Sequence, residues 1–129
     1  MLLLAVGGSH PLREPCRRVL AAAAAGDLRL HLSVEGGQEF LFHRFRMVDP
    51  ADAIEQFDLV DRLVVWHALD HDILRASRDL VAAGHVRGRD SVHAATALGA
   101  GFQAIVSCDS DFDAIPGLRR VDPATDGVF

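Results

Sequence analysis

Several features that would place a protein in a class at once are missing from this sequence of 129 residues. No apolar run approaches the roughly 18 residues that suggest a membrane span. The opening segment Met1–Val6 is apolar, but it lacks a preceding basic segment and runs at once into Gly7 and Gly8, unlike a secretory signal. We therefore expect a cytoplasmic protein without a membrane partner.

Cysteine is scarce, because only Cys16 and Cys108 occur, and these two lie far apart in the sequence. They form no pair with the spacing of a metal site, although they could in principle bridge. Isolated thiols in a chain without a secretory signal are more often buried as small hydrophobic side chains. We expect that role for both.

Lysine is absent, since all 13 Lys and Arg positions are arginine, and 18 acidic residues bring the net charge to −5. This charge argues against a protein that holds nucleic acid by a broad basic surface. It does not exclude an enzyme that gathers acidic residues in one cleft and reaches phosphate through a metal ion.

Three common catalytic or binding motifs are also absent. The chain has no Gly-x-x-x-x-Gly-Lys-Ser/Thr loop for nucleotide hydrolysis, and no serine lies in a recognisable nucleophile turn. A nucleotide- or cofactor-binding α/β domain is a further hypothesis, but no glycine fingerprint supports it.

The hydrophobic pattern predicts strands that alternate with helices over a single domain of residues 1–129. This order indicates an α/β fold with a mainly parallel sheet. Expected helices cover Leu12–Ala25, Ser33 towards Arg46, the segment after Asp49-Pro50 with Ile54, Phe57, Val60 and Leu63 inside, Asp70 or Asp72 to Gly84 with Ile73, Ala76, Leu80 and Ala83 inside, and Asp90 to Gly99; expected strands cover Leu28–Leu32, Val64–Trp66, Ala104–Ser107 and Leu118–Val121.

Four acidic residues stand out by their positions: Glu39 in a helix after a strand, Asp90 at the start of a helix, and Asp109 and Asp111 directly after an apolar strand. Separately, each has a structural explanation as a helix cap, a turn residue or a solvated charge. Ligands of such folds gather where strands end in loops. Carboxylates brought together there would favour Mg²⁺ or Mn²⁺ over Zn²⁺, and such an ion can activate water beside a phosphate.

Two stretches of the second half carry a resemblance to a known family. They are Arg87–Leu98, which reads Arg-Gly-Arg-Asp-Ser-Val-His-Ala-Ala-Thr-Ala-Leu, and Ile105–Phe112, which reads Ile-Val-Ser-Cys-Asp-Ser-Asp-Phe. Ser33, followed six positions later by Glu39, is similar to the second acidic motif of that family. Together these residues resemble the VapC-like PIN domains over nearly the whole chain.

The resemblance implies a three-layer PIN-like fold, with a central sheet flanked by helices, and a metal-dependent endoribonuclease that uses Mg²⁺ or Mn²⁺. Such proteins are toxins of type II (VapBC-like) toxin–antitoxin systems, bind a small cognate antitoxin, and are often homodimers. Carried over by position, Glu39, Asp90 and Asp109 would be metal-site acids and Asp111 an auxiliary acid in the same loop. Apolar candidates for a dimer surface are Leu12, Val19, Phe42 and Phe45.

Four further side chains near these acids could have a functional or a structural role. His93 shares a helix face with Asp90, yet the family's chemistry needs no general base, and a lone helix histidine is usually structural. Thr96 is expected to serve packing. Arg87 and Arg89 could hold phosphate or pair with surface acids.

The sequence departs from the family at its beginning. Family members start with a strand that ends in an aspartate, whereas this chain starts inside the following run, and no acidic residue precedes Glu14. We hypothesise that the natural product begins upstream of Met1, with a gene in decay as the rival explanation. We predict that Met1–Val6 do not form the first central strand, which would be missing or incomplete. The alternative function is a catalytically inactive PIN-like domain that binds an antitoxin or RNA.

Overall fold

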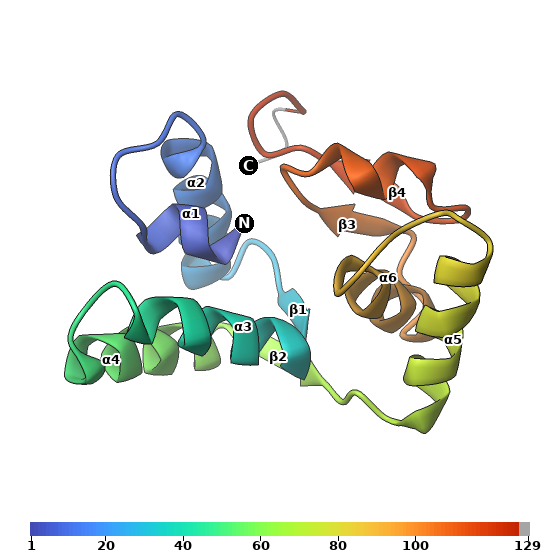
Figure 1. Cartoon of the computed structure of the whole chain (residues 1–129). Helices are drawn as coiled ribbons and strands as arrows, with labels where there is room; N and C mark the ends of the chain where they lie inside the picture. Colours follow the sequence, from blue (N-terminus) through green and yellow to red (C-terminus); the bar gives the residue numbers. More distant parts are fainter. Residues whose placement is uncertain (127–129) are drawn as a thin grey trace.

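The structure, a computed structural model, describes residues 1–126 and shows helices around short strands (Figure 1). α1 and α2 lie together, α3 and α4 form a second pair, and α5 packs on α6. The elements in chain order are α1 (Leu2–Val6), α2 (Arg13–Ala25), β1 (Leu30–Ser33), α3 (Val34–Phe45), α4 (Pro50–Asp61), β2 (Val64–His67), α5 (His71–Ala82), α6 (Asp90–Gly99), β3 (Ala104–Val106), the 3-10 helix η1 (Ser110–Ala114) and β4 (Arg119–Val121).

Local chemistry sets most helix ends where the sequence predicts them. The Ser33 hydroxyl accepts a hydrogen bond from the Gly36 N–H at 3.1 Å and caps α3. The Asp70 carboxylate caps α5 in the same way, through the Ile73 N–H at 2.9 Å. Asp49 precedes α4, as expected, but makes no capping hydrogen bond with its side chain, so the start of α4 rests on its neighbour in the first turn, a proline.

The predicted inner faces of α4 and α5 are partly wrong. Ile54, Ala76 and Ala83 are exposed, although the apolar pattern placed them inside. On α5 the position next to Ala76 is buried instead, because the Ser77 hydroxyl contacts the Ser91 hydroxyl of α6 at 2.6 Å. A paired hydroxyl can be buried at little cost. The buried face of α5 is therefore centred on Ser77 and not on Ala76.

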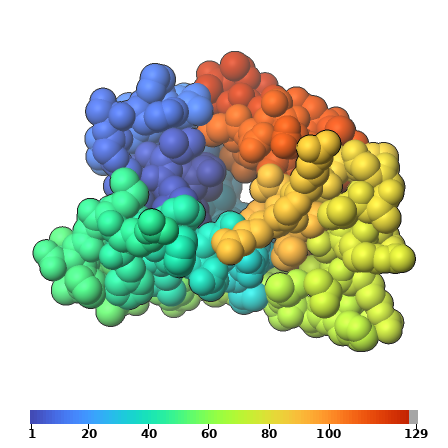
Figure 2. Space-filling view, in the orientation of Figure 1, coloured from blue at the N-terminus to red at the C-terminus, as the bar shows by residue number. Residues whose placement is uncertain are grey.

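The four strands form two separate parallel pairs, β1 with β2 and β3 with β4, which corrects the expected single central sheet. Met1–Val6 supply no strand, as predicted, because Leu2–Val6 is the helix α1. In residues 1–126 no strand lies between β1 and β3. A cavity of about 460 Å³ is lined by both strands, and Figure 2 shows a hollow near the middle of the molecule.

The residues of β3 are less buried than the sequence predicts. Ile105 and Val106 are only partly buried and Ala104 is exposed, whereas the sequence predicts a buried strand. The reason is that one edge of β3 borders the cavity instead of another strand.

Two hydrophobic clusters lie on either side of this cavity. One joins α6 to η1 and to the segment before β4 around Ala94, Phe112 and Leu118. The other joins α1, α3 and α4 around Phe40 and Val60, with partly buried side chains packed against it. None of the helices within residues 1–126 combines the length and the apolar character that a bilayer crossing requires.

The cysteines lie closer together than their sequence separation suggests. The Cys16 and Cys108 sulfurs are 3.6 Å apart, and both thiols are free. Cys16 is fully buried, as expected, and this burial, with the neighbouring Cys108, raises its pKa to about 11. Cys108 is only partly buried.

Candidate metal centre

Three of the four predicted acids converge beside the cavity between β1 and β3. Asp90 is the first residue of α6, Asp109 follows β3, and Asp111 lies in η1. One carboxylate oxygen from each lies within 4.8 Å of the other two. Asp90 is partly buried, and the other two are exposed, so the cluster opens to solvent.

Local hydrogen bonds fix the loop that carries two of these acids. The Asp109 Oδ1 atom accepts the Asp111 N–H at 2.9 Å, and the Asp109 N–H donates to the Ser107 hydroxyl at 3.1 Å. Asp109 therefore stabilises its turn, which is the structural role that the sequence also allowed. A carboxylate has two oxygens with about four lone-pair sites, so this bond leaves Asp109 able to accept further ligands.

The surroundings of Asp90 disfavour the charged form of its carboxyl group. Burial raises the pKa of its carboxyl above the usual range, and the Asp109 carboxylate adds to the rise. Glu39 and Asp111 act in the same direction more weakly, whereas His93 opposes them. Gathered carboxylates of this kind suit a hard divalent cation with oxygen ligands, such as Mg²⁺ or Mn²⁺. Asp90, Asp109 and Asp111 are the residues of this structure that would hold it.

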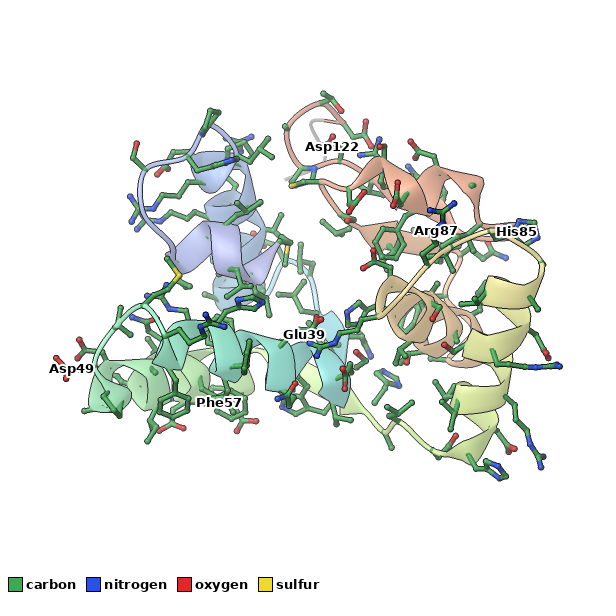
Figure 3. All side chains as sticks on the ribbon, viewed as in Figure 1. Glu39, Asp49, Phe57, His85, Arg87 and Asp122 are labelled. Atoms are coloured by element: carbon green, nitrogen blue, oxygen red, sulfur yellow. The ribbon has the colours of Figure 1, made fainter. Side chains whose placement is uncertain are left out.

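Glu39 lies beside this cluster and outside it. It lines the same cavity as Asp90 and Asp109, and Figure 3 shows it near the centre of the molecule. Its Oε1 atom is 3.2 Å from Arg89 Nη1, and its Oε2 atom is 3.1 Å from His93 Nε2. The sequence predicts Glu39 as a metal ligand and Asp111 as auxiliary, but the geometry puts Asp111 in the cluster and ties Glu39 to basic neighbours.

Sequence reasoning missed the contacts that surround Glu39. His93 Nδ1 also lies 2.8 Å from the Ser33 hydroxyl, so Ser33, His93 and Glu39 form one hydrogen-bonded chain. The only sequence signal was the three-residue spacing of His93 from Asp90. Nothing in the sequence pairs His93 with Ser33, 60 positions earlier, or with Glu39, 54 positions earlier.

The remaining candidates near the site are Arg89, Thr96 and Arg87. Arg89 forms an ion pair with Glu39 and, at 3.5 Å, with Glu35, as one of the two hypotheses for this arginine predicted. The Thr96 hydroxyl donates to the Val92 carbonyl of its own helix and is buried, in line with the expected packing role. Figure 3 shows Arg87 on the side of the loop between α5 and α6, well apart from Glu39 in this view.

Comparison with known protein sequences identifies the family of the chain. The PIN domain pattern matches residues 2–118. Ribonuclease VapC13 of Mycobacterium tuberculosis is 30% identical over 119 residues, 90% of each chain. Ribonuclease VapC7 of the same organism is 29% identical over an alignment of 135 residues, 99% of this chain and 90% of VapC7.

A solved structure agrees with the fold. A chain in the structure of VapBC-1 from nontypeable Haemophilus influenzae superposes with a TM-score of 0.67 at 19% identity, covering 87% of this chain and 90% of that one. The protein therefore belongs to the PIN-domain family, with VapC ribonucleases among its relatives. The predicted PIN-like α/β fold with parallel strands flanked by helices is confirmed.

Proposed function

We propose that this protein is a metal-dependent endoribonuclease and the toxin of a type II, VapBC-like toxin–antitoxin system that acts in the cytoplasm. The observation that carries the proposal is the convergence of Asp90, Asp109 and Asp111 within 4.8 Å, at the edge of a cavity in a PIN-domain fold. Relatives at 29–30% identity over most of the chain are named ribonucleases, which supports the reaction class.

The chain's own residues would divide the work by position. Asp90, Asp109 and Asp111 would hold a Mg²⁺ or Mn²⁺ ion, with Glu39 at the neighbouring wall of the cavity. Such an ion, when bound, would stabilise the negative charge that develops on a scissile phosphodiester and lower the pKa of a bound water. Asp109 and Asp111 are exposed, so RNA can approach from the solvent side. The hydrogen bonds of Asp109 with Ser107 and Asp111 order the loop that carries both exposed carboxylates.

RNA cleavage by the purified chain tests the proposal. We expect cleavage that requires Mg²⁺ or Mn²⁺, stops on chelation, and is lost in Asp90→Asn. Asp27→Asn is the matched control, because it removes one exposed carboxylate in the turn after α2 and far from the cluster in sequence. Cleavage by Asp90→Asn at the wild-type rate would remove Asp90 from the mechanism.

The proposed partners are RNA, a small cognate antitoxin and a second copy of the chain. Support for the antitoxin comes from the structural neighbour, whose structure is of VapBC-1. Two of the apolar candidates for the dimer surface, Phe42 and Phe45 on α3, are 46% and 44% exposed. Val19 was a further candidate, but it is fully buried and is excluded from that surface.

A second candidate function is a catalytically inactive PIN-like domain that binds an antitoxin or RNA. It is favoured by the engagement of both Glu39 oxygens with Arg89 and His93, which leaves three acids in the cluster. RNA that binds to the purified chain under the conditions of the cleavage assay, and is not cleaved, would support this alternative over the nuclease.

A further inference from the structure

A chain of hydrogen bonds links the start of α3 to the acid site through α6. The Ser33 hydroxyl lies 2.8 Å from His93 Nδ1, and His93 Nε2 lies 3.1 Å from Glu39 Oε2. Ser33 is only 6% exposed, and the His93 and Glu39 side chains are 21% and 26% exposed. Asp90 lies one helical turn before His93 on the same helix, so the chain ties Glu39 to the element that carries Asp90.

The direction of each hydrogen bond follows from the groups that take part. An ionised Glu39 carboxylate only accepts, so the proton of that bond must sit on His93 Nε2. The Ser33 oxygen already accepts the Gly36 N–H at 3.1 Å, and its own proton is free to be donated to His93 Nδ1. A neutral His93 with its proton on Nε2 therefore satisfies all three groups at once.

The imidazole ring of His93 is mostly buried and lies near the first turn of α3. A Cβ atom at Gly36 would lie 3.6 Å from His93 Cε1, the carbon between the two ring nitrogens, so the ring rests on the first turn of α3. Arg89 holds the other Glu39 oxygen, but its side chain is 56% exposed and is also shared with Glu35. Exposed ion pairs contribute little to fixing a geometry. His93 is the better-buried of the two groups on Glu39.

We infer that His93 is a positioning residue, which holds the Glu39 carboxylate at the wall of the metal cavity while Ser33 fixes the orientation of the imidazole. The inference rests on the proposed function, since it takes Glu39 as a further carboxylate ligand of the ion held by Asp90, Asp109 and Asp111, the role that the sequence predicts for Glu39. A hydrogen-bond partner of this kind alters metal affinity by about 10–100-fold when it is removed.

Two substitutions of His93 separate its two hydrogen bonds. The amide nitrogen of glutamine lies near the place of Nε2, so His93→Gln keeps the donor to Glu39. Asparagine is shorter and reaches only the place of Nδ1, so His93→Asn keeps the contact with Ser33 and loses the one with Glu39. His71→Asn, on the exposed first turn of α5, is the matched control.

The test measures the affinity of each folded variant for Mn²⁺ by calorimetry, with thermal unfolding as the check on folding. We expect His93→Asn to bind Mn²⁺ about 10–100-fold more weakly than wild type, His93→Gln to recover most of that loss, and His71→Asn to match wild type. The ring nitrogen chemical shifts of wild-type His93 in NMR spectra should show the proton on Nε2.

The outcomes distinguish this inference from the function on which it rests. Wild-type affinity in a folded His93→Asn, or a wild-type His93 ring with no proton on Nε2, would overturn the positioning role and leave the nuclease proposal standing. Wild-type protein that binds no Mn²⁺ and cleaves no RNA would overturn both. Equal losses in His93→Gln and His93→Asn would also overturn it, because the donor to Glu39 would then not matter.

Discussion

The acid cluster predicts that one substitution should have opposite effects on stability with and without metal. Asp111→Asn removes a charge from a group of three carboxylates whose oxygens lie within 4.8 Å of one another. The bond to Asp109 uses the Asp111 backbone N–H, so asparagine keeps it. Without metal the variant should be more stable than wild type. With metal it should be less stable, because one of the ligands is weakened.

The magnitude follows from the spacing of the charges. Two unit charges 4.8 Å apart repel by about 0.9 kcal/mol in water, and Asp111 faces both Asp90 and Asp109. Asp111 also lies in the first turn of η1, where the helix dipole favours a carboxylate by about 0.3–1 kcal/mol. The net gain for the metal-free variant is therefore about 1 kcal/mol, or a rise in Tm of about 4 °C for a domain of this size.

Thermal unfolding with and without Mg²⁺ or Mn²⁺ measures both effects. At about 100 times its Kd, a bound ion stabilises wild type by about 2.7 kcal/mol, and Asp111→Asn should lose most of this gain. Raising the salt concentration should shrink the metal-free difference, because Asp111 is exposed. Asp27→Asn should leave the response to metal unchanged. A metal-free Asp111→Asn that is less stable than wild type would refute the repulsion argument.

Three further predictions concern stability. Gly36→Ala should raise the free energy of unfolding by up to about 1 kcal/mol in urea titrations, since alanine favours helix and its Cβ would lie 3.6 Å from its nearest neighbours, an ordinary contact. Gly37→Ala should lower it by about 1–3 kcal/mol, because the added Cβ would fall 2.9 Å from the Trp66 ring; equal stability of the two variants would contradict the packing. The hydrogen bond from Arg120 lowers the pKa of Asp113, so this pair stabilises the fold above the unfolded pKa near 3.8, and its contribution disappears as the pH falls through the lower folded value. Asp113→Asn should therefore be less stable than wild type at neutral pH, with a difference that shrinks as the pH falls through the lower folded pKa of Asp113; a difference that does not change with pH would contradict the pair as its source.

The sequence by itself determined the local structure and the acids worth considering. Ser33 and Asp70 cap the helices that follow them because a side-chain oxygen next to an apolar periodic segment satisfies free N–H groups. Asp109 was found because it follows a short apolar strand, and Asp90 because it opens a helix. Both signals lie within a few neighbouring residues, where composition and period are sufficient.

Only the tertiary structure decided which of these side chains meet. The meeting of Asp111 with Asp90 and Asp109, and the place of Glu39 beside them, depend on how η1 and α3 lie relative to α6, and no periodicity within these segments records those distances. The burial of Ser77 against Ser91 and the link from Ser33 to His93 are likewise contacts between different helices or strands, which no single segment records. The separation of β1 from β3 belongs here too, because strand pairing is a property of the whole sheet.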